Sequence, residues 1–505
     1  MKTYSKTASF PEQPPMKERL LRGISLFLLL GLLAWVGCTP KARLNQNGPL
    51  LSGGKTQVPT LDASRISILA DSLAQVYLKA GEIPGISMAV AKEGEVVFSK
   101  GYGEANLELG MPACSHTVYK IRSVTKQFTA ALVMRLVEAG KISLDDSITR
   151  FLPDYPTQGH HITIRNLLNH TSGISNQSSS LTLQTALNGG NKQWFKLDLS
   201  LEEMIDRFGK LPFNFKPGQQ FQYNNLGYYL LGHIIQKITG MPYAAYLEQE
   251  LLQPLELGET LFADDHRIIL NRAAGYEFYG GKLMNAPYTS PQAGFAAGAI
   301  GSTVGDLVKW THLLHSGKVV SKESLQQMTS PTVLSNGDTV GYGFGLYLAE
   351  LGSHRKVYHG GTRPGFGAYL AHYPEAGVTI AILTNSGSGR EKAAEMEKVL
   401  ARSALNEKVL NLPLAQQDLE PYTGTYTFQS TPTKSRELRV FYENGQLKGQ
   451  MTGGKPFRLL YQGQHVFIPE VNDTMRLIFS MENGRVDRLK IKEGPWEVTP
   501  ATRKS

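Results

Sequence analysis

The stretch SVTKQFTAALVMRLVEAG (residues 123–140) carries both a helix and a candidate reactive pair. Apolar residues fill most of Thr125–Ala139 and Gly140 follows as a stop signal, which predicts a buried helix. Ser123 and Lys126 are three residues apart, so they lie on one helical face. A serine hydroxyl needs an adjacent base, and a lysine can be that base when its pKa is lowered by burial or a neighbouring cation. The positive helix end disfavours the lysine charge and stabilises an oxyanion.

The chain contains two further Ser-x-x-Lys matches, Ser52 with Lys55 and Ser353 with Lys356. The first lies in a polar stretch rich in glycine, and the second lies in a polar turn before a strand. Because neither begins an apolar helix, we predict that Ser123 is the nucleophile and Lys126 its partner.

A second candidate element is Tyr223-Asn224-Asn225, within FQYNNLGYYLLG. A tyrosine near a cationic lysine can become a phenolate and take the serine proton. The amide of Asn225 can hydrogen-bond both the lysine and a substrate. The alternative interpretation of Tyr223 is a core aromatic residue.

A third candidate element is His359-Gly360-Gly361-Thr362, within KVYHGGTRPGFGAYL. A glycine-rich backbone on an edge strand lets a substrate lie alongside it. The backbone N–H of Thr362 could pair with that of Ser123 as an oxyanion hole. The alternative interpretation of His359 is a strand histidine without a functional role.

The pattern of elements around these motifs predicts an α+β fold. Strands at both ends of the segment bracket a helical, loop-rich middle at about residues 123–320, and a helix is expected at each end. This favours an antiparallel sheet flanked by helices with a large helical subdomain, and a cleft where the two parts meet. The expected elements are a helix from Asp62 to about Ala80, strands at Ile86–Val90, Val96–Ser99, Tyr342–Leu351, Val357–His359, Ala368–Tyr373 and Val378–Leu383, and a helix at Arg390–Asn406.

At about residues 415–505 the sequence pattern changes to strand-like runs, which predict a small all-β domain. Asn444-Gly445 and Asn483-Gly484 are hairpin signals, each between strand-like runs. We therefore divide the chain into a leader at 1–38, a flexible tether at 39–60, a catalytic domain at 61–408 and the β-domain at 415–505.

The sequence of the leader, residues 1–38, predicts that the protein is exported from the cytoplasm. Basic residues precede a thirteen-residue apolar run, ISLFLLLGLLAWV (residues 24–36), which is too short for a membrane span of about 20 residues but fits a signal peptide. Val36-Gly37-Cys38 follows and is similar to a bacterial lipobox, so we expect Cys38 to be lipidated and the protein to be held at a membrane in the cell envelope. A plain cleaved signal and an uncleaved anchor are the alternatives.

The composition and the motifs that are absent from the sequence argue against several classes of protein. The net charge is +9, but the basic residues are scattered and do not form a nucleic-acid arm. Two cysteines exclude a disulfide-stapled scaffold. No HxHxDH or HExxH pattern is present, so we expect no metal and no other cofactor.

The three motifs in this order resemble those of the penicillin-binding, class C β-lactamase-like serine hydrolases. The resemblance extends over roughly residues 63–400 and includes ITIRNLLNHTSGI (162–174), PGQQFQYNNLGYYLLG (217–232), AGAIGSTVGDLVKW (297–310) and HGGTRPGFG (359–367). The tail resembles the lipocalin-like β-domain that is appended to such hydrolases.

This resemblance implies that an acyl-enzyme forms on Ser123 and that Lys126 and Tyr223 share the role of general base. It implies that Asn225, His359, Gly361 and Thr362 bind a small-molecule or peptide acyl substrate. Class C β-lactamases carry Lys-Thr-Gly where this chain has His-Gly-Gly, which favours a D-alanyl-D-alanine carboxypeptidase or an esterase. The alternatives are a β-lactamase, a transpeptidase and a non-catalytic envelope binding protein on the same scaffold.

Overall fold

The computed structural model describes residues 61–175, 200, 203, 205–362, 364–407, 411, 414–431, 434–471, 475–482, 485–493 and 497–503. The predicted leader, Cys38 and the tether lie outside the described residues, as do Arg363 and the Asn483-Gly484 turn. In the part of the chain that is described, no helix is both long and apolar enough to cross a membrane.

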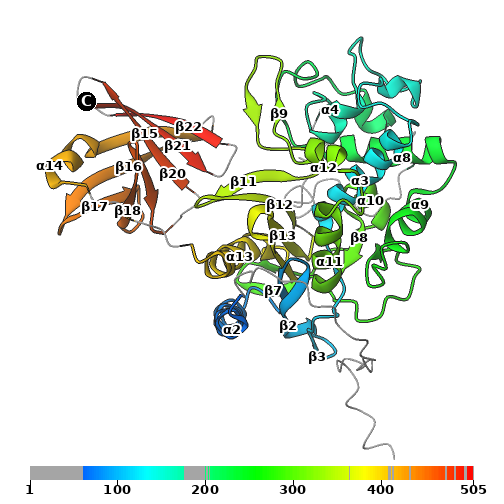
Figure 1. The fold of residues 1–505 in the computed structure, drawn as a ribbon, viewed down its shortest axis with the longest axis horizontal. Coiled ribbons are helices and arrows are strands. Elements are labelled where there is room, and N and C mark those ends of the chain that lie inside the picture. Colours follow the sequence, from blue (N-terminus) through cyan, green and yellow to red (C-terminus); the bar gives the residue numbers. More distant parts are fainter. Residues whose placement is uncertain are drawn as a thin grey trace, which may run out of the picture. The chain divides into compact units, whose positions relative to one another are not determined.

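A seven-stranded antiparallel sheet with the order β11-β12-β13-β14-β1-β2-β3 forms the centre of the catalytic domain (Figure 1). The central strands are buried on both faces, and β1 pairs with β14, which brings the two ends of the domain together. The predicted antiparallel sheet is confirmed. Its strands are β1 (Gly85–Lys92), β2 (Glu95–Asn106), β3 (Met111–Pro112), β11 (Tyr347–Leu351), β12 (His354–Thr362), β13 (Gly367–Tyr373) and β14 (Val378–Thr384).

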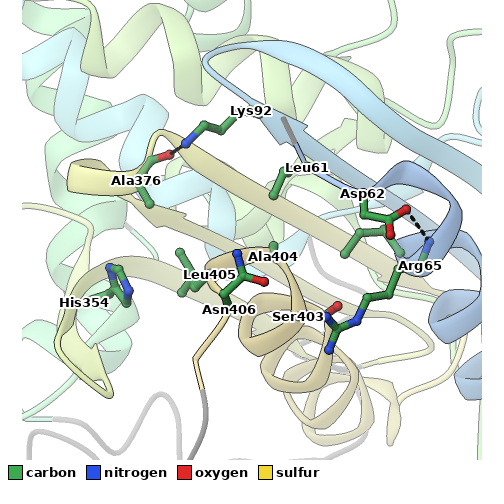
Figure 2. Close-up of a pocket in the computed structure, with 11 residues that line it drawn as sticks. Leu61, Asp62, Arg65, Lys92, His354, Ala376, Ser403, Ala404, Leu405 and Asn406 are labelled. Carbon is green, nitrogen blue, oxygen red and sulfur yellow. Dashed lines mark hydrogen bonds between the residues drawn. The ribbon is translucent and has the colours of Figure 1, made fainter. Parts of the chain in front are cut away.

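Two helices cover one face of this sheet, α2 (Ala63–Lys79) and α13 (Gly389–Leu405). Asp62 caps α2 by accepting a hydrogen bond from the Arg65 N–H at 3.0 Å, as expected for its position. The core between them and the sheet contains Ile66, Ala70, Met88, Val90, Ile380, Ile382, Met396 and Leu400. At one margin of this face a hollow of about 220 Å³ lies between the start of α2 and the end of α13 (Figure 2).

The helical subdomain and the other face of the sheet share a second and larger core. Within it, α11 packs against β1 and β14, and α3 packs against α8 and α10. The helices of this part are α3 (Thr125–Glu138), α4 (Ile164–Leu168), α8 (Asn225–Thr239), α9 (Tyr243–Leu247), α10 (Pro291–Gly298), α11 (Val304–His315) and α12 (Lys322–Met328). Short strands complete it: β4 (Tyr119–Lys120), β5 (Leu261–Phe262), β6 (Tyr276–Tyr279), β7 (Lys282–Asn285), β8 (Ile300–Ser302), β9 (Thr332–Val333) and β10 (Thr339–Val340).

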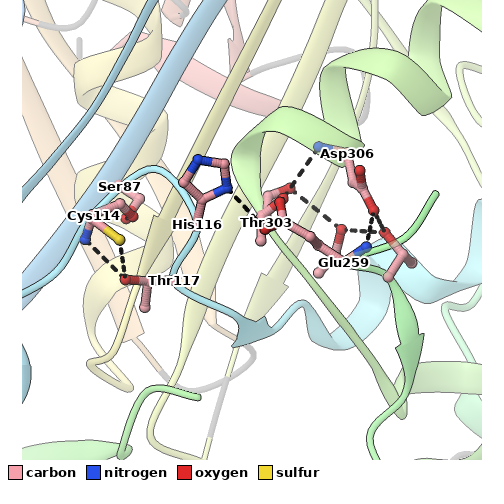
Figure 3. A network of polar contacts seen from close by, with 9 residues as sticks. Ser87, Cys114, His116, Thr117, Glu259, Thr303 and Asp306 are labelled. Carbon is pink, nitrogen blue, oxygen red and sulfur yellow. Dashed lines mark hydrogen bonds and ion pairs between the residues drawn. The ribbon is translucent and has the colours of Figure 1, made fainter. Parts of the chain in front are cut away.

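A polar network fixes the start of α11 (Figure 3). Thr303 caps the helix by accepting a hydrogen bond from the Asp306 N–H and donates one to Glu259. The Asp306 carboxylate accepts hydrogen bonds from the Glu259 N–H and the Thr260 hydroxyl, while the His116 ring lies 2.8 Å from the Glu259 carboxylate. The network ties the loop around residue 116 to α11 and shares no residue with the motifs described above.

Strands β15–β22 close into a barrel, which confirms the predicted all-β tail. Its interior is filled by apolar side chains such as Tyr426, Phe467, Leu477 and Phe479. Asn444 and Gly445 have positive φ angles of 53° and 77°, as a tight hairpin turn requires. The strands are β15 (Gly424–Thr431), β16 (Lys434–Glu443), β17 (Gln446–Met451), β18 (Phe457–Gly463), β19 (Val466–Pro469), β20 (Met475–Glu482), β21 (Arg485–Glu493) and β22 (Glu497–Arg503), preceded by α14 (Gln416–Leu419).

Candidate active site

Ser123 lies in a single 3-10 turn, η1 (Arg122–Val124), that leads directly into α3. The residue before it, Arg122, has a φ of 54°, a left-handed conformation that is uncommon for a residue other than glycine. The buried Arg122 guanidinium donates to the Pro364 carbonyl and lies 5.5 Å from the Phe366 ring centre. A strained turn is thus held by an anchored side chain, and it presents Ser123 at the helix start. Sequence reasoning gave Arg122 no role.

Lys126 is fully buried one turn after Ser123. Its Nζ lies 3.3 Å from Ser123 Oγ, 2.8 Å from Asn225 Oδ1 and 2.9 Å from the Ala297 carbonyl oxygen. Burial lowers the pKa of Lys126 well below its ordinary value of 10.5. A neutral amine has two N–H groups and one lone pair. Asn225 and Ala297 accept the two N–H groups, which leaves the lone pair for the proton of Ser123.

Tyr223 and Asn225 lie on either side of Asn224, whose side chain caps α8 by accepting from the Leu226 N–H at 2.9 Å. The Tyr223 ring centre is 4.8 Å from Lys126 Nζ. The Tyr223 hydroxyl is buried and interacts with Ser123, although among the described residues no hydrogen bond to it has ideal geometry. Burial and the nearby Tyr347 raise the pKa of Tyr223 well above 10, although Ser123 acts to lower it.

These directions disagree with the phenolate that we considered for Tyr223. A phenolate requires a charged lysine beside it, whereas burial favours the neutral form of both groups. Burial therefore favours an unprotonated Lys126 and a Tyr223 phenol that can donate a proton. The core-aromatic alternative for Tyr223 does not explain a buried hydroxyl that interacts with Ser123 and has no well-formed hydrogen bond elsewhere among the described residues.

Strand β12 brings the third motif against η1. A Cβ atom on Gly361 would lie 2.2 Å from the Ile121 carbonyl oxygen, so only glycine allows this approach. Thr362 ends the strand, and its hydroxyl lies 3.2 Å from the Gly387 carbonyl oxygen. Strand β11 pairs with β12 only as far as Tyr358, and among the described strands none pairs with that edge at residues 359–362. An extended substrate can lie along this edge.

His359 is buried, and its Nε2 lies 3.3 Å from the Tyr342 hydroxyl. Burial, with a smaller contribution from Lys126, lowers the pKa of His359 to about 3, so this position carries no positive charge near neutral pH. The His359 ring centre is 6.0 Å from that of Tyr223. Histidine in the third motif is therefore part of the same buried group of side chains as the second motif.

The structure thus brings Ser123, Lys126, Tyr223, Asn225 and His359 together from separate parts of the chain. The alternative pair, Ser353 and Lys356, is kept apart from these residues. Lys356 Nζ binds the buried carboxylate of Glu397, a residue of α13, at 2.5 Å. Sequence reasoning also gave no role to His170 or Tyr342, which contact Tyr223 and His359. The signal that could have found them is that His170 falls inside one of the family-like stretches.

Comparisons with known proteins agree with this geometry. The family model described as Beta-lactamase matches residues 70–405. Protein flp of Staphylococcus aureus (strain MW2) is 29% identical over 323 residues, which are 63% of this chain and 63% of the relative. The chain therefore covers less than two thirds of the length of this curated relative.

Two solved structures are also similar. The octameric penicillin-binding protein homologue from Pyrococcus abyssi has a TM-score of 0.61 and 25% identity, and the alignment covers 88% of this chain and 100% of that one. The D-amino acid amidase from Ochrobactrum anthropi SV3 has a TM-score of 0.59 and 26% identity, covering 68% and 99%. Because the family model matches well over half of the residues, the chain belongs to the Beta-lactamase family of serine hydrolases and penicillin-binding proteins.

Proposed function

We propose that this protein hydrolyses an ester, an amide or a D-amino-acid peptide through an acyl-enzyme on Ser123. The observation that carries the proposal is the 3.3 Å approach of Lys126 Nζ to Ser123 Oγ, with the other two contacts of Nζ directed to oxygen acceptors. In the first step Ser123 Oγ forms a bond to the substrate carbonyl carbon, and its proton moves to Lys126. The backbone N–H groups of Ser123 and Thr362 are proposed to hold the oxyanion.

The tetrahedral adduct then collapses. The bond from carbon to the leaving group breaks, the leaving group takes the proton of the Tyr223 hydroxyl, and Lys126 returns its proton to Tyr223. Water attacks the acyl-enzyme by the reverse route and regenerates the Ser123 hydroxyl. Asn225 and the β12 edge at His359–Thr362 orient the substrate, since Asn225 already accepts from Lys126 and that edge has no strand partner in the described residues.

The charge of the third motif supports this choice of substrate class. His359 is neutral, so it does not attract the carboxylate of a β-lactam as a lysine would. A D-amino acid amidase is among the similar structures, which supports a D-amino-acid amide or peptide as substrate. A β-lactamase remains the second candidate. It would be favoured if wild-type turnover of penicillins far exceeded that of the best ester, whereas we expect turnover of carboxylated β-lactams to rise in His359→Lys.

We also propose that the protein acts outside the cytoplasm, held at a membrane by lipid on Cys38. The support is the short apolar run that ends at Gly37-Cys38. An acyl substrate in the cell envelope is consistent with a cell-wall peptide or an ester at the membrane surface.

The test is covalent labelling with a fluorescent phosphonate, a fluorescent penicillin and a short-chain ester, followed by intact mass. We expect at least one probe to add a single acyl or phosphonyl group to the wild type and none to Ser123→Ala. Ser353→Ala is the matched control, because Ser353 belongs to the second Ser-x-x-Lys match and lies in an exposed turn. Undiminished labelling of Ser123→Ala would refute the assignment, and labelling of neither wild type nor variant would favour the non-catalytic binding protein.

A further inference from the structure

His170 contacts both neighbours of Tyr223 in the chain. Its backbone carbonyl accepts a hydrogen bond from the Gln222 N–H at 3.0 Å, and its Nδ1 accepts one from the Asn224 N–H at 3.2 Å. The His170 ring also packs on the Tyr223 ring, with 4.3 Å between ring centres. One residue therefore holds the backbone on both sides of Tyr223 and one face of its ring.

The backbone of His170 supports a special role. His170 has a φ of 61°, in the left-handed region, and it is almost completely buried. A residue other than glycine in this region stores strain, which persists only where surrounding contacts impose it. The conformation turns the carbonyl and the ring of His170 toward the same short segment, residues 222–224.

The ring nitrogens of His170 and His359 connect the second motif to the third. Because His170 Nδ1 accepts from Asn224, neutral His170 carries its proton on Nε2, which lies 3.1 Å from the Tyr342 hydroxyl. His359 Nδ1 lies 2.7 Å from the Gly360 carbonyl oxygen, so it holds the proton, and Nε2 accepts from Tyr342 at 3.3 Å. Tyr342, which also interacts with Tyr228, thus links His170 to His359, and His170 in turn holds the Asn224 N–H.

Ionisation of these side chains is not expected to disrupt this series of hydrogen bonds. Burial lowers the pKa of His170 well below 6.5, and Lys126 and His359 lower it further. Burial raises the pKa of Tyr342 well above 10. Burial therefore favours the neutral forms of His170, Tyr342 and His359, in which each side chain keeps one fixed pattern of donors and acceptors.

We propose that His170 is a positioning residue that fixes Tyr223 for proton transfer at Ser123, and that Tyr342 extends this control to His359. This inference rests on the proposed acyl-enzyme function. His170 has two arms: the first holds Tyr223 through Asn224, and the second holds His359 through Tyr342. Because the Tyr223 hydroxyl interacts with Ser123 and takes part in the proposed proton transfer, the first arm has the larger effect on the reaction.

The test measures the acylation rate constant and the half-saturating concentration of whichever probe labels the wild type, on folded protein. His170→Leu removes both arms, and we expect the rate constant to fall about a hundredfold, as expected when a reacting group is misplaced by about 1 Å, with half-saturation little changed. His170→Asn keeps an acceptor for the Asn224 N–H and tolerates the left-handed backbone, so it should recover to within about tenfold of the wild type.

The second arm is tested by a double-mutant cycle. Tyr342→Phe should cost about tenfold, and His170→Asn with Tyr342→Phe should cost no more than either alone, because both remove the same arm. His372→Asn is the control: His372 is also buried and bonded through Nδ1, to Thr379, but it lies away from Ser123 on β13. It should lower the melting temperature and leave the acylation rate constant unchanged.

Three results would overturn the inference. They are a wild-type rate constant in His170→Leu, a His170→Asn variant no faster than His170→Leu, and additive losses in the double variant. If His170→Leu does not fold, the cycle of His170→Asn and Tyr342→Phe decides alone. A wild type that labels while these variants label equally well refutes only the role of His170, whereas a wild type that no probe labels refutes the acyl-enzyme itself.

Discussion

At the scale of single residues, the reactivity of Ser123 depends on burying a lysine. Lys126 makes its contacts inside the protein with no exposed surface, and its pKa is held well below 10.5. Removing a charge from water is costly, so the buried group gives up its proton instead. A lysine on an exposed helix would keep the proton and could not accept that of Ser123.

This burial predicts a pH dependence of stability. Lys126 in the unfolded chain stays protonated up to about pH 10.4, whereas the folded protein releases that proton at a much lower pH. Between the two pKa values the unfolded state binds more protons, so the contribution of Lys126 to the free energy of unfolding rises with pH. We expect Lys126→Met to flatten this rise in urea unfolding curves taken from pH 6 to pH 9.

The same variant should lose activity. Without the amine, acylation is expected to fall by at least about a hundredfold, the usual lower value for loss of a general base. Acylation by the wild type should fall as pH drops through the folded-state pKa of Lys126, because the proton then occupies the lone pair. An unchanged slope of stability with pH in Lys126→Met, or an acid limb that persists in it, would contradict this account.

At the scale of elements, the site depends on how closely β12 approaches η1. The approach is set by Gly361, where a side chain would meet the Ile121 carbonyl and the Arg122 side chain. The same approach brings the end of β12, where Thr362 lies, against the turn that carries Ser123. A shift of β12 therefore changes both the edge where a substrate lies and the proposed oxyanion hole.

We predict that Gly361→Ala lowers stability by about 1–3 kcal/mol, as overpacking does, and lowers the acylation rate constant by about a hundredfold. Gly305→Ala is the matched control, because Gly305 lies in α11 and a Cβ atom added there would meet no atom closer than Thr303 Oγ1, at 3.9 Å. It should leave both quantities unchanged or raise stability slightly. Chemical denaturation and probe kinetics measure the two effects, and equal behaviour of the two alanine variants would show that the approach of β12 is unimportant.

At the scale of the whole molecule, the described apolar residues fall into separate cores. The two cores of the catalytic domain contain described residues only up to Leu405, and the barrel core begins at Leu414. Each part therefore has its own source of folding free energy.

We predict that a chain ending after Asn411 stays folded and is labelled at the wild-type rate. Limited proteolysis should give the same separation, with a labelled fragment that ends near residue 411. A soluble truncated protein that does not label would show that the barrel takes part in acyl-enzyme formation.

Cys38 predicts how the whole chain is distributed in the cell. We expect Cys38→Ser to remove the mass of the lipid and to move the protein from the membrane to the soluble fraction, or to block its processing, because acyl chains provide about 0.8 kcal/mol of membrane affinity per buried CH₂ group. Intact mass and fractionation measure this. Unchanged mass and fractionation in the variant would show that the anchor lies elsewhere.

Local sequence patterns predicted the helices and strands and the main candidate residues of the site. Helix spacing placed Lys126 beside Ser123, the Asp62 cap and the Gly140 stop bounded their helices to within about one residue, and Asn444-Gly445 set a barrel turn. These signals are local, since they depend on backbone geometry within a few residues. The order of the three motifs added the family, which the comparison confirmed.

The protonation states that burial favours, and the residues that support the site, depend on long-range packing. Burial depends on what packs around a side chain, so the sequence left open a Tyr223 phenolate that the buried site does not favour. His170, Tyr342 and Arg122 contact the site from positions far along the chain, and their roles depend on hydrogen-bond directions and left-handed backbone that no spacing encodes. Long-range packing sets the local dielectric and the donor geometry, and these are the properties that make a serine reactive.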